Sequence, residues 1–129
     1  DNNVKTTAID GLPFNIQNAV YKTELVDITK TAFCINVDLV HSIELVEHIE
    51  EKYLQNLLDT LCCGKYLLMT HGLPGQEGHH HVNCQEKKYW INHMQNRGFI
   101  ELTEESKKLQ KLAKRAKHLK ESLIFFKKQ

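Results

Sequence analysis

One stretch limits the fold of this chain more than any other, because an apolar run of strand length passes directly into a helical pattern. Leu39, Val40 and Ile43 form this run, which follows Asp38. Residues 50–61 then repeat apolar side chains at every third or fourth position, which is the period of an amphipathic helix. A strand followed at once by such a helix is half of a βαβ unit. The chain is therefore predicted to be an α/β protein.

Three polar side chains lie between this strand and this helix: Glu44, Glu47 and His48. In open α/β sheets, ligands bind beyond the carboxyl ends of the strands, which is where these residues fall. On a helix, their spacing of i, i+3 and i+4 would put all three side chains on one face. Two carboxylates and an imidazole are suitable ligands for Mg²⁺, Mn²⁺ or Zn²⁺. This trio is therefore the first candidate for a functional site.

The same stretch resembles a motif of a known family. From Asp38 it reads Asp-Leu-Val-His-Ser-Ile-Glu-Leu-Val-Glu-His-Ile, and it is similar to the fourth-strand motif of class I S-adenosylmethionine-dependent methyltransferases. The branch with this form includes ubiquinone-pathway O-methyltransferases and small-RNA 2′-O-methyltransferases. The loop from Gly72, Gly-Leu-Pro-Gly-Gln-Glu-Gly-His-His-His-Val-Asn, resembles a second segment of the family. The resemblance extends from the second strand of the family's sheet to the seventh.

The resemblance implies a Rossmann-like fold over residues 1–129 as one partial methyltransferase domain, with a mostly parallel sheet whose last strand is antiparallel. It also implies S-adenosyl-L-methionine as the cofactor. The family's first strand, with its G-x-G-x-G turn, has no counterpart in this sequence. We therefore expect the sheet to lack its central strand, either because residues upstream of Asp1 are missing or because the protein is a remnant.

Three residues are candidates for cofactor binding on this resemblance. Asp10 ends a predicted strand and matches the acid that binds the ribose hydroxyls in the family. Asp27 ends the next strand and matches the acid near the adenine amino group, and Ser42 lies within the fourth-strand motif. The simpler interpretations are an Asp-Gly turn at Asp10 and a helix cap or turn at Asp27. Both interpretations remain open from the sequence.

In the metal-dependent branches of the family, the trio is joined by a histidine from the loop after the fifth strand. The corresponding ligand here would be His79, His80 or His81, of which we favour His80. His48 and Glu44 are also the candidate catalytic residues, because relatives without a metal use such a pair to shape the cofactor pocket or to transfer protons. Metal binding, acid–base catalysis and a structural role therefore all remain open for these residues.

The rest of the chain continues the alternation of strands and helices. The pattern predicts helices over residues 12–20, 86–97 and 106–120, and strands over residues 4–9, 21–26, 65–69, 99–102 and 123–126. Tyr89 and Trp90 would either line an acceptor pocket or, as we prefer for Trp90, pack in the core with the indole N–H hydrogen-bonded. Cysteines occur at four positions without C-x-x-C spacing, so we expect free thiols in a reducing cytoplasm.

The charge is unevenly distributed. Residues 107–129 carry nine basic side chains and one acid, whereas residues 1–106 carry eight basic and fifteen acidic ones. The basic end is compatible with an RNA acceptor or with a solvated lysine-rich helix face. The sequence contains no basic strand interleaved with aromatic residues that would read bases, so a small-molecule acceptor is equally compatible. We expect no DNA partner and, without an apolar run of membrane-spanning length, no membrane.

These observations predict a cytoplasmic methyltransferase that acts on an unidentified acceptor, with metal-assisted O-methylation as the preferred reaction. The alternative is a methyltransferase-like protein without catalytic activity, which serves as a binding or scaffold subunit. A third interpretation is a histidine-rich metal-binding protein that is unrelated to methyl transfer.

Overall fold

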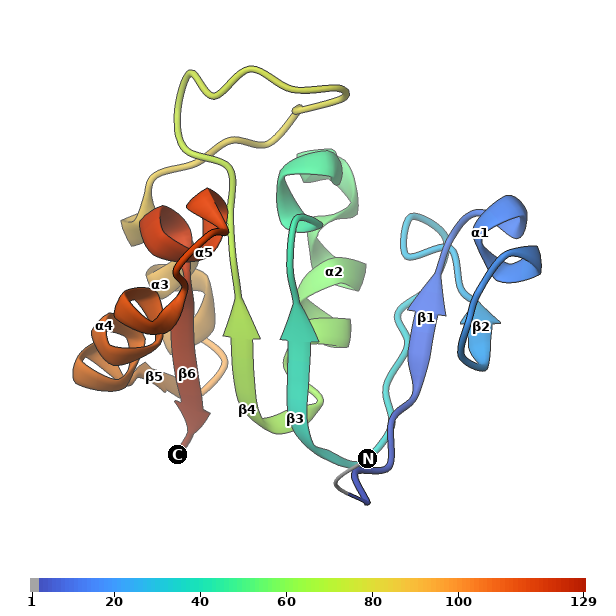
Figure 1. Cartoon of the computed structure of the whole chain (residues 1–129), viewed down its shortest axis with the longest axis horizontal. Helices are drawn as coiled ribbons and strands as arrows, with labels where there is room; N and C mark the ends of the chain where they lie inside the picture. The colour runs from blue at the N-terminus through green and yellow to red at the C-terminus, as the bar shows by residue number, and fades with distance from the viewer. Residues whose placement is uncertain (1–2) are drawn as a thin grey trace.

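The strands of this protein form two separate sheets (Figure 1). The computed structural model describes residues 3–129. Within them, β1 (Ala8–Asp10) and β2 (Thr23–Leu25) form a short parallel pair. The other sheet has the strand order β3-β4-β6-β5 and is built from β3 (Val37–Ser42), β4 (Gly64–Met69), β5 (Phe99–Glu101) and β6 (Ile124–Lys128). The α/β prediction is confirmed.

The larger sheet is mixed, so the prediction of a mostly parallel sheet is wrong. β3 and β4 are parallel, but β6 runs antiparallel to both β4 and β5, which makes two of the three pairings antiparallel. The chain reaches β5 before β6, and the last strand then returns between β5 and β4. An antiparallel last strand was predicted and is present.

Within residues 3–129, no strand joins the two sheets. β1 pairs only with β2, and β3 pairs only with β4, so each of these strands has one edge without a strand partner. Figure 1 shows the β1–β2 pair standing beside β3, and β1 and β3 point the same way. The small sheet is therefore held in place by the connecting chain and by side-chain packing.

Seven helical segments surround the sheets in the described chain. They are α1 (Pro13–Gln17), the 3₁₀ turns η1 (Val46–His48) and η2 (Glu51–Tyr53), α2 (Leu54–Leu61), α3 (Lys87–Gln95), α4 (Thr103–Leu112) and α5 (Lys117–Ser122). The longest has ten residues, and none in residues 3–129 is long and apolar enough to cross a membrane.

The predicted helix over residues 106–120 is two helices rather than one. α4 ends at Leu112, whose side chain is 72% exposed, and α5 begins at Lys117. The interruption falls in the most basic part of the chain, where lysines and an arginine recur at spacings of three and four residues. Like charges at these spacings oppose a continuous helix, because they repel one another on one face.

The core lies between the larger sheet and the helices that cover it. Its fully buried members come from both layers and include Leu57, Leu61, Leu67, Trp90, Phe99 and Phe126. The preference for Trp90 as a core residue is confirmed, since its side chain is completely buried. The expectation that its indole N–H would be hydrogen-bonded is wrong, because Nε1 has no partner within the described residues.

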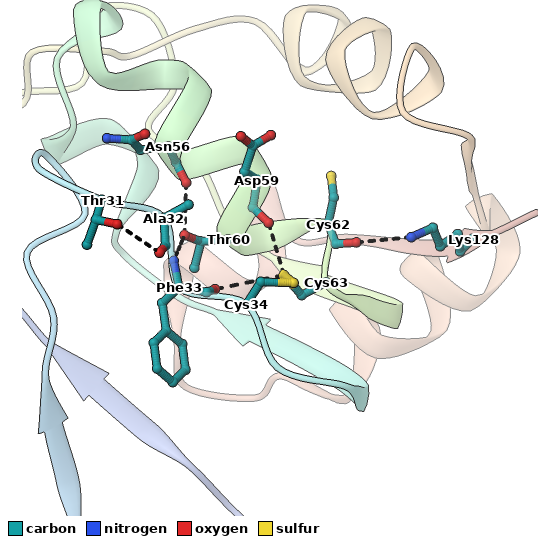
Figure 2. Close-up of a disulfide and its surroundings, with 10 residues drawn as sticks. All are labelled: Thr31, Ala32, Phe33, Cys34, Asn56, Asp59, Thr60, Cys62, Cys63 and Lys128. Atoms are coloured by element: carbon teal, nitrogen blue, oxygen red, sulfur yellow. Dashed lines mark hydrogen bonds between the residues drawn. A yellow bond between two sulfur atoms is a disulfide. The ribbon is translucent and has the colours of Figure 1, made fainter.

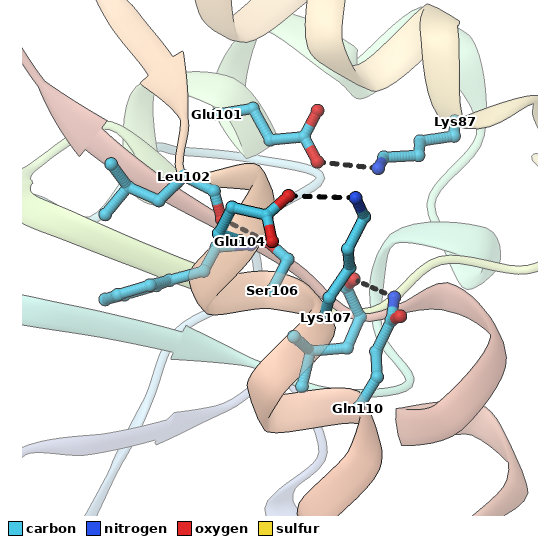
Figure 3. Close-up of polar contacts among 9 residues, drawn as sticks. Lys87, Glu101, Leu102, Glu104, Ser106, Lys107 and Gln110 are labelled. Atoms are coloured by element: carbon cyan, nitrogen blue, oxygen red, sulfur yellow. Dashed lines mark hydrogen bonds and ion pairs between the residues drawn. The ribbon is translucent and has the colours of Figure 1, made fainter.

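A buried serine attaches α4 to the sheet (Figure 3). The Ser106 hydroxyl donates to the Leu102 carbonyl oxygen at 2.8 Å and accepts the backbone N–H of Phe125 at 2.9 Å. Further along α4, the Gln110 amide donates to the Leu123 carbonyl oxygen at 2.9 Å. These contacts hold α4 against the beginning of β6.

A disulfide joins Cys34 to Cys63 (Figure 2). The prediction of free thiols is therefore wrong for this pair and correct for Cys62 and Cys84. The two bonded residues are 29 positions apart in sequence, but the fold places their Cα atoms 5.4 Å apart. Spacing along the chain carries no information about such a pair, because the fold alone decides which cysteines meet.

Candidate functional site

The site is built where the chain leaves β3. After β3 ends at Ser42, the chain forms the 3₁₀ turn η1, which carries Glu47 and His48. The long loop after β4 folds back over this turn. The N–H groups of Val82 and Asn83 both donate to the Glu47 carbonyl oxygen, at 2.9 and 3.0 Å. Two segments that are far apart in sequence are thereby fixed against each other.

Glu47 is the most unusual side chain of this region. It is completely buried, and neither of its carboxylate oxygens has a hydrogen-bond partner within the described residues. Burial raises the pKa of this carboxyl, and the nearby Glu44 carboxylate adds to the rise, while His48 and His81 act in the opposite direction. A buried carboxylate without a hydrogen-bond donor is costly, so the neutral form is favoured unless a cation lies beside it.

Glu47, His48 and His81 form a group that is suited to a metal ion. One ligand atom from each of them lies within 4.8 Å of the others. The rings of His48 and His81 meet edge to face, with their centroids 4.9 Å apart. One carboxylate and two imidazoles are a common ligand set for zinc.

The His81 ring is oriented by the loop itself. Its Nδ1 lies 3.3 Å from the Gln76 carbonyl oxygen, and donation of a hydrogen bond there would leave the Nε2 lone pair available as an acceptor or ligand. A side chain at Gly78 would overlap the same ring. A Cβ at Gly72 would lie 2.7 Å from the Cys84 sulfur and 2.8 Å from the Glu47 Cβ. The loop can therefore approach η1 this closely only because both positions are glycine.

The predicted metal set was Glu44, Glu47, His48 and His80, and the structure brings only two of these together in the metal-suited group. Glu44 precedes the helical turn, with φ at 52°, so the argument that placed it on the same helical face is wrong. His80 also has a left-handed backbone, with φ at 56°, and the chain turns there. His81 occupies the place beside Glu47 instead.

A cavity of about 400 Å³ lies between the two sheets. It collects Asp10, Asp27, His48 and His80, which come from four separate segments of the chain. Its other walls are mainly apolar and include Ile9, Val26, Ile28, Leu45 and Ile49. Apolar walls with a few convergent polar groups are typical of a small-molecule site. We call this space the inter-sheet cavity.

The two aspartates of this cavity already make local hydrogen bonds. The Asp10 carboxylate accepts the Leu12 N–H at 2.8 Å and the Asn15 side-chain amide at 2.9 Å. Asp27 accepts the N–H and the hydroxyl of Thr29 at 3.0 and 2.6 Å. The Thr29 hydroxyl, followed by Lys30, holds the pKa of Asp27 below its usual value. Both residues are thus turn residues, as the simpler interpretation had it, and their cofactor role stays a prediction.

The two remaining predicted residues lie elsewhere. Ser42 is buried, its hydroxyl has no partner within the described chain, and it does not line the inter-sheet cavity. Glu44 lines a second cavity, of about 560 Å³, together with Gln76 and His118. Its backbone N–H donates to the Thr70 hydroxyl at 2.9 Å.

Sequence reasoning missed His71 and Cys84, which lie at the two ends of the loop. His71 is 2% exposed, with Nδ1 3.3 Å from the Gly72 carbonyl oxygen, and burial lowers the pKa of its imidazole. Burial, followed by the charge of Glu47, raises the pKa of the Cys84 thiol. The only sequence signal was their position in a loop of unusual length and composition.

Neither a family model nor a curated protein matches this sequence.

Proposed function

We propose that this protein is an S-adenosylmethionine-dependent methyltransferase domain whose cofactor binds in the inter-sheet cavity. The observation that carries the proposal is the convergence of Asp10, Asp27 and His48 on one cavity at the carboxyl ends of β1, β2 and β3. Ligands of α/β proteins bind at this end of the strands. The sequence resemblance to class I methyltransferases points to the same residues.

The chemistry of the cavity is compatible with an adenosyl group. Its aliphatic side chains offer an apolar surface to an adenine base. Each aspartate oxygen has two acceptor positions, so the carboxylates can accept ribose hydroxyls or an amino group in addition to their turn hydrogen bonds. Asp27 keeps its charge down to low pH, because Thr29 and Lys30 stabilise the carboxylate.

Methyl transfer to an oxygen requires a proton acceptor near the methyl acceptor. His48 lines the cavity and is half-buried, so in this proposal it is the base that takes the proton from the acceptor hydroxyl. Alignment of acceptor oxygen, methyl carbon and sulfur supplies the rest of the rate enhancement. The acceptor itself, a small molecule or RNA, stays open.

A divalent metal held by Glu47, His48 and His81 would be part of this reaction. The residues fit such an ion, because Glu47 is buried without a hydrogen-bond donor and the other two ligand atoms lie within 4.8 Å of it. A bound ion would lower the pKa of an acceptor hydroxyl and orient it. His48 then acts as a ligand and not as the base, so the metal-dependent and metal-free versions of the proposal are mutually exclusive for this residue.

Calorimetry with S-adenosylhomocysteine tests the proposal. We expect binding that is weakened by at least about tenfold, or about 1.4 kcal/mol, in Asp27→Asn. Asp38→Asn is the matched control, because Asp38 is also an aspartate paired with a lysine but lies outside the cavity. Binding without methyl transfer to any acceptor would favour the scaffold alternative, and no binding by the wild-type protein would exclude the cofactor site.

Metal binding without methyl transfer is a second candidate function, and the buried unpaired carboxylate of Glu47 favours it. Titration of the chelator-treated protein with Zn²⁺ tests it. We expect Glu47→Gln to weaken Zn²⁺ binding at least about a hundredfold, because the amide keeps the shape of the side chain but is a poor ligand. Zn²⁺ binding with equal affinity in Glu47→Gln would rule this centre out.

A further inference from the structure

The link between the two sheets depends on one short segment. Residues 26–36 lead from β2 to β3 and thus connect the small sheet to the larger one. The two sheets share no strand pairing within the described chain. Ile28 is the buried apolar residue of this segment. Farther along, the same segment is fixed to the end of α2 by the Cys34–Cys63 disulfide.

Figure 2 shows how the segment meets α2. The Phe33 backbone N–H donates to the Thr60 hydroxyl at 3.0 Å, and that hydroxyl donates to the Asn56 carbonyl oxygen at 2.8 Å. Next to this contact lies the disulfide from Cys34 to Cys63, just beyond the end of α2. One hydrogen bond and one covalent bond therefore carry most of this attachment.

The same segment forms one wall of the inter-sheet cavity. Residues 26–29 line one side, and Leu45, His48 and Ile49 line the other. The second group follows β3 and belongs to the larger sheet's side of the molecule. A bond that fixes residue 34 to α2 thus limits how far the two walls can separate.

We propose that Cys34 and Cys63 form a reversible thiol–disulfide exchange site, which a glutathione-type thiol opens and the corresponding small disulfide closes. In opening, the external thiolate attacks the Cys34 sulfur, the bond between Cys34 and Cys63 breaks, and the Cys63 thiolate leaves and takes a proton from water. A second external thiol then attacks the mixed disulfide and releases Cys34. The net change is one protein disulfide and two small thiols to one protein dithiol and one small disulfide.

The surroundings of Cys34, Cys63 and Cys62 favour exchange of the disulfide with an external thiol. Cys34 is exposed and Cys63 is half-buried, so a small thiol can reach the bond from the Cys34 side. The neighbouring Cys62 is not positioned to compete, since its sulfur packs 3.7 Å from the Met94 sulfur. Burial raises the pKa of the Cys62 thiol to about 11, and a thiol that stays protonated is a poor nucleophile.

The first test compares the protein equilibrated with oxidised and with reduced glutathione. Alkylation and mass spectrometry should find two free cysteines, Cys62 and Cys84, in the oxidised sample, and all four in the reduced one. Amide hydrogen exchange of residues 8–29 should become at least about tenfold faster on reduction, whereas exchange in β4 should stay unchanged. Equal exchange of residues 8–29 in both samples, or no Cys34–Cys63 bond with oxidised glutathione, would overturn the inference.

Variants separate the bond from other effects of reduction. In Cys34→Ser, the amides of residues 8–29 should exchange at the fast rate with or without reductant. In Cys84→Ser, amide exchange should respond to reduction as it does in the wild-type protein. Loss of the response in Cys84→Ser would contradict the assignment to the Cys34–Cys63 pair.

The consequence for the ligand rests on the proposed function. If the cofactor binds in the inter-sheet cavity, reduction should weaken S-adenosylhomocysteine binding by about tenfold. No binding in either form would refute the proposed function, while the hydrogen exchange of residues 8–29 would still decide whether the disulfide controls the cavity wall.

Discussion

At the scale of single residues, the charge states of two buried side chains affect the stability of the long loop after β4. Glu47 and His71 are both almost fully buried, and burial shifts their pKa values in opposite directions, up for the acid and down for the base. In each case the neutral form is favoured, because charge is poorly solvated in the interior. The loop is therefore most stable when neither group is charged or when a cation compensates Glu47.

The lowered pKa of His71 predicts a loss of stability in mild acid. As the pH falls below about 6.5, the unfolded chain takes up a proton at His71 that the folded protein does not, so the free energy of unfolding falls. Above that pH both states are neutral and the effect is absent. Each unit of pKa difference is worth about 1.4 kcal/mol once the pH is below both values.

Urea unfolding between about pH 5 and pH 7.5 measures this effect. His71→Gln should lose less stability toward acid than the wild-type protein does, because glutamine does not titrate. His41→Gln, at an exposed position of β3, is the control and should follow the wild-type curve. A wild-type curve as flat as that of His71→Gln would contradict the shift.

Variants of His80 and His81 test whether the metal ligand is the histidine favoured from the sequence or the one that the structure places beside Glu47. His81→Ala should weaken Zn²⁺ binding at least about a hundredfold, because it removes a ligand that the Gln76 carbonyl orients. His80→Ala should leave the affinity within a factor of about two, since His80 lies outside the metal-suited group. Titration of both variants with Zn²⁺ decides the matter, and the reverse order would restore the sequence prediction.

The sequence pointed to the region that carries the metal-suited group but not to all three of its members. The apolar run and the helical pattern identified the strand and the turn that carry Glu47 and His48. Whether His80 or His81 reaches them depends on a left-handed backbone at His80, which is a non-glycine residue and gives no signal in the sequence. Glu44 was misplaced for the same reason, because its positive φ takes it off the helical face.

At the scale of elements, strand and helix positions followed from periodicity, and their ends did not. β4 and α3 lie within two residues of the predicted ranges. The predicted helix over residues 106–120 failed in its middle, where apolar spacing favoured a helix and repeated positive charge opposed it. The disulfide could not be predicted at all, because it depends on how the segment before β3 passes the end of α2.

The attachment of α4 predicts a stability effect at Ser106. Ser106→Ala removes the buried acceptor of the partly buried Phe125 N–H and leaves that group without a partner, which should cost about 1–3 kcal/mol of unfolding free energy. Chemical denaturation followed by circular dichroism measures it. Lys107→Ala is the control on the same helix, since its ion pair with Glu104 is exposed and should contribute little. Equal losses in the two variants would show that the buried contact is not what holds α4.

At the scale of the whole molecule, the division into two sheets is the dominant feature. The β1–β2 pair has three residues in each strand, and none of its residues is fully buried. The four-stranded sheet has the core. β1 and β3 point the same way but do not pair with each other. A unit with few buried apolar side chains opens at a lower free energy than the core does.

Ile28 tests whether the two parts unfold separately. It is 8% exposed and packs with the core cluster, so it joins the small sheet to the rest. Ile28→Ala should cost about 2–5 kcal/mol of local stability, and the loss should fall on residues 8–29, whose amide exchange accelerates. Fluorescence of the single tryptophan, Trp90, reports on the core and should show an almost unchanged unfolding midpoint.

The matched control is Leu58→Ala in α2, at a residue that is 2% exposed and packs in the same core cluster. This variant should lower the Trp90 unfolding midpoint clearly, because its cavity lies between α2 and the larger sheet. If Ile28→Ala lowers the midpoint as much as Leu58→Ala does, the two sheets form one cooperative unit. A ligand in the inter-sheet cavity would then need no help from the disulfide to keep the walls together, so this comparison also bears on the redox inference.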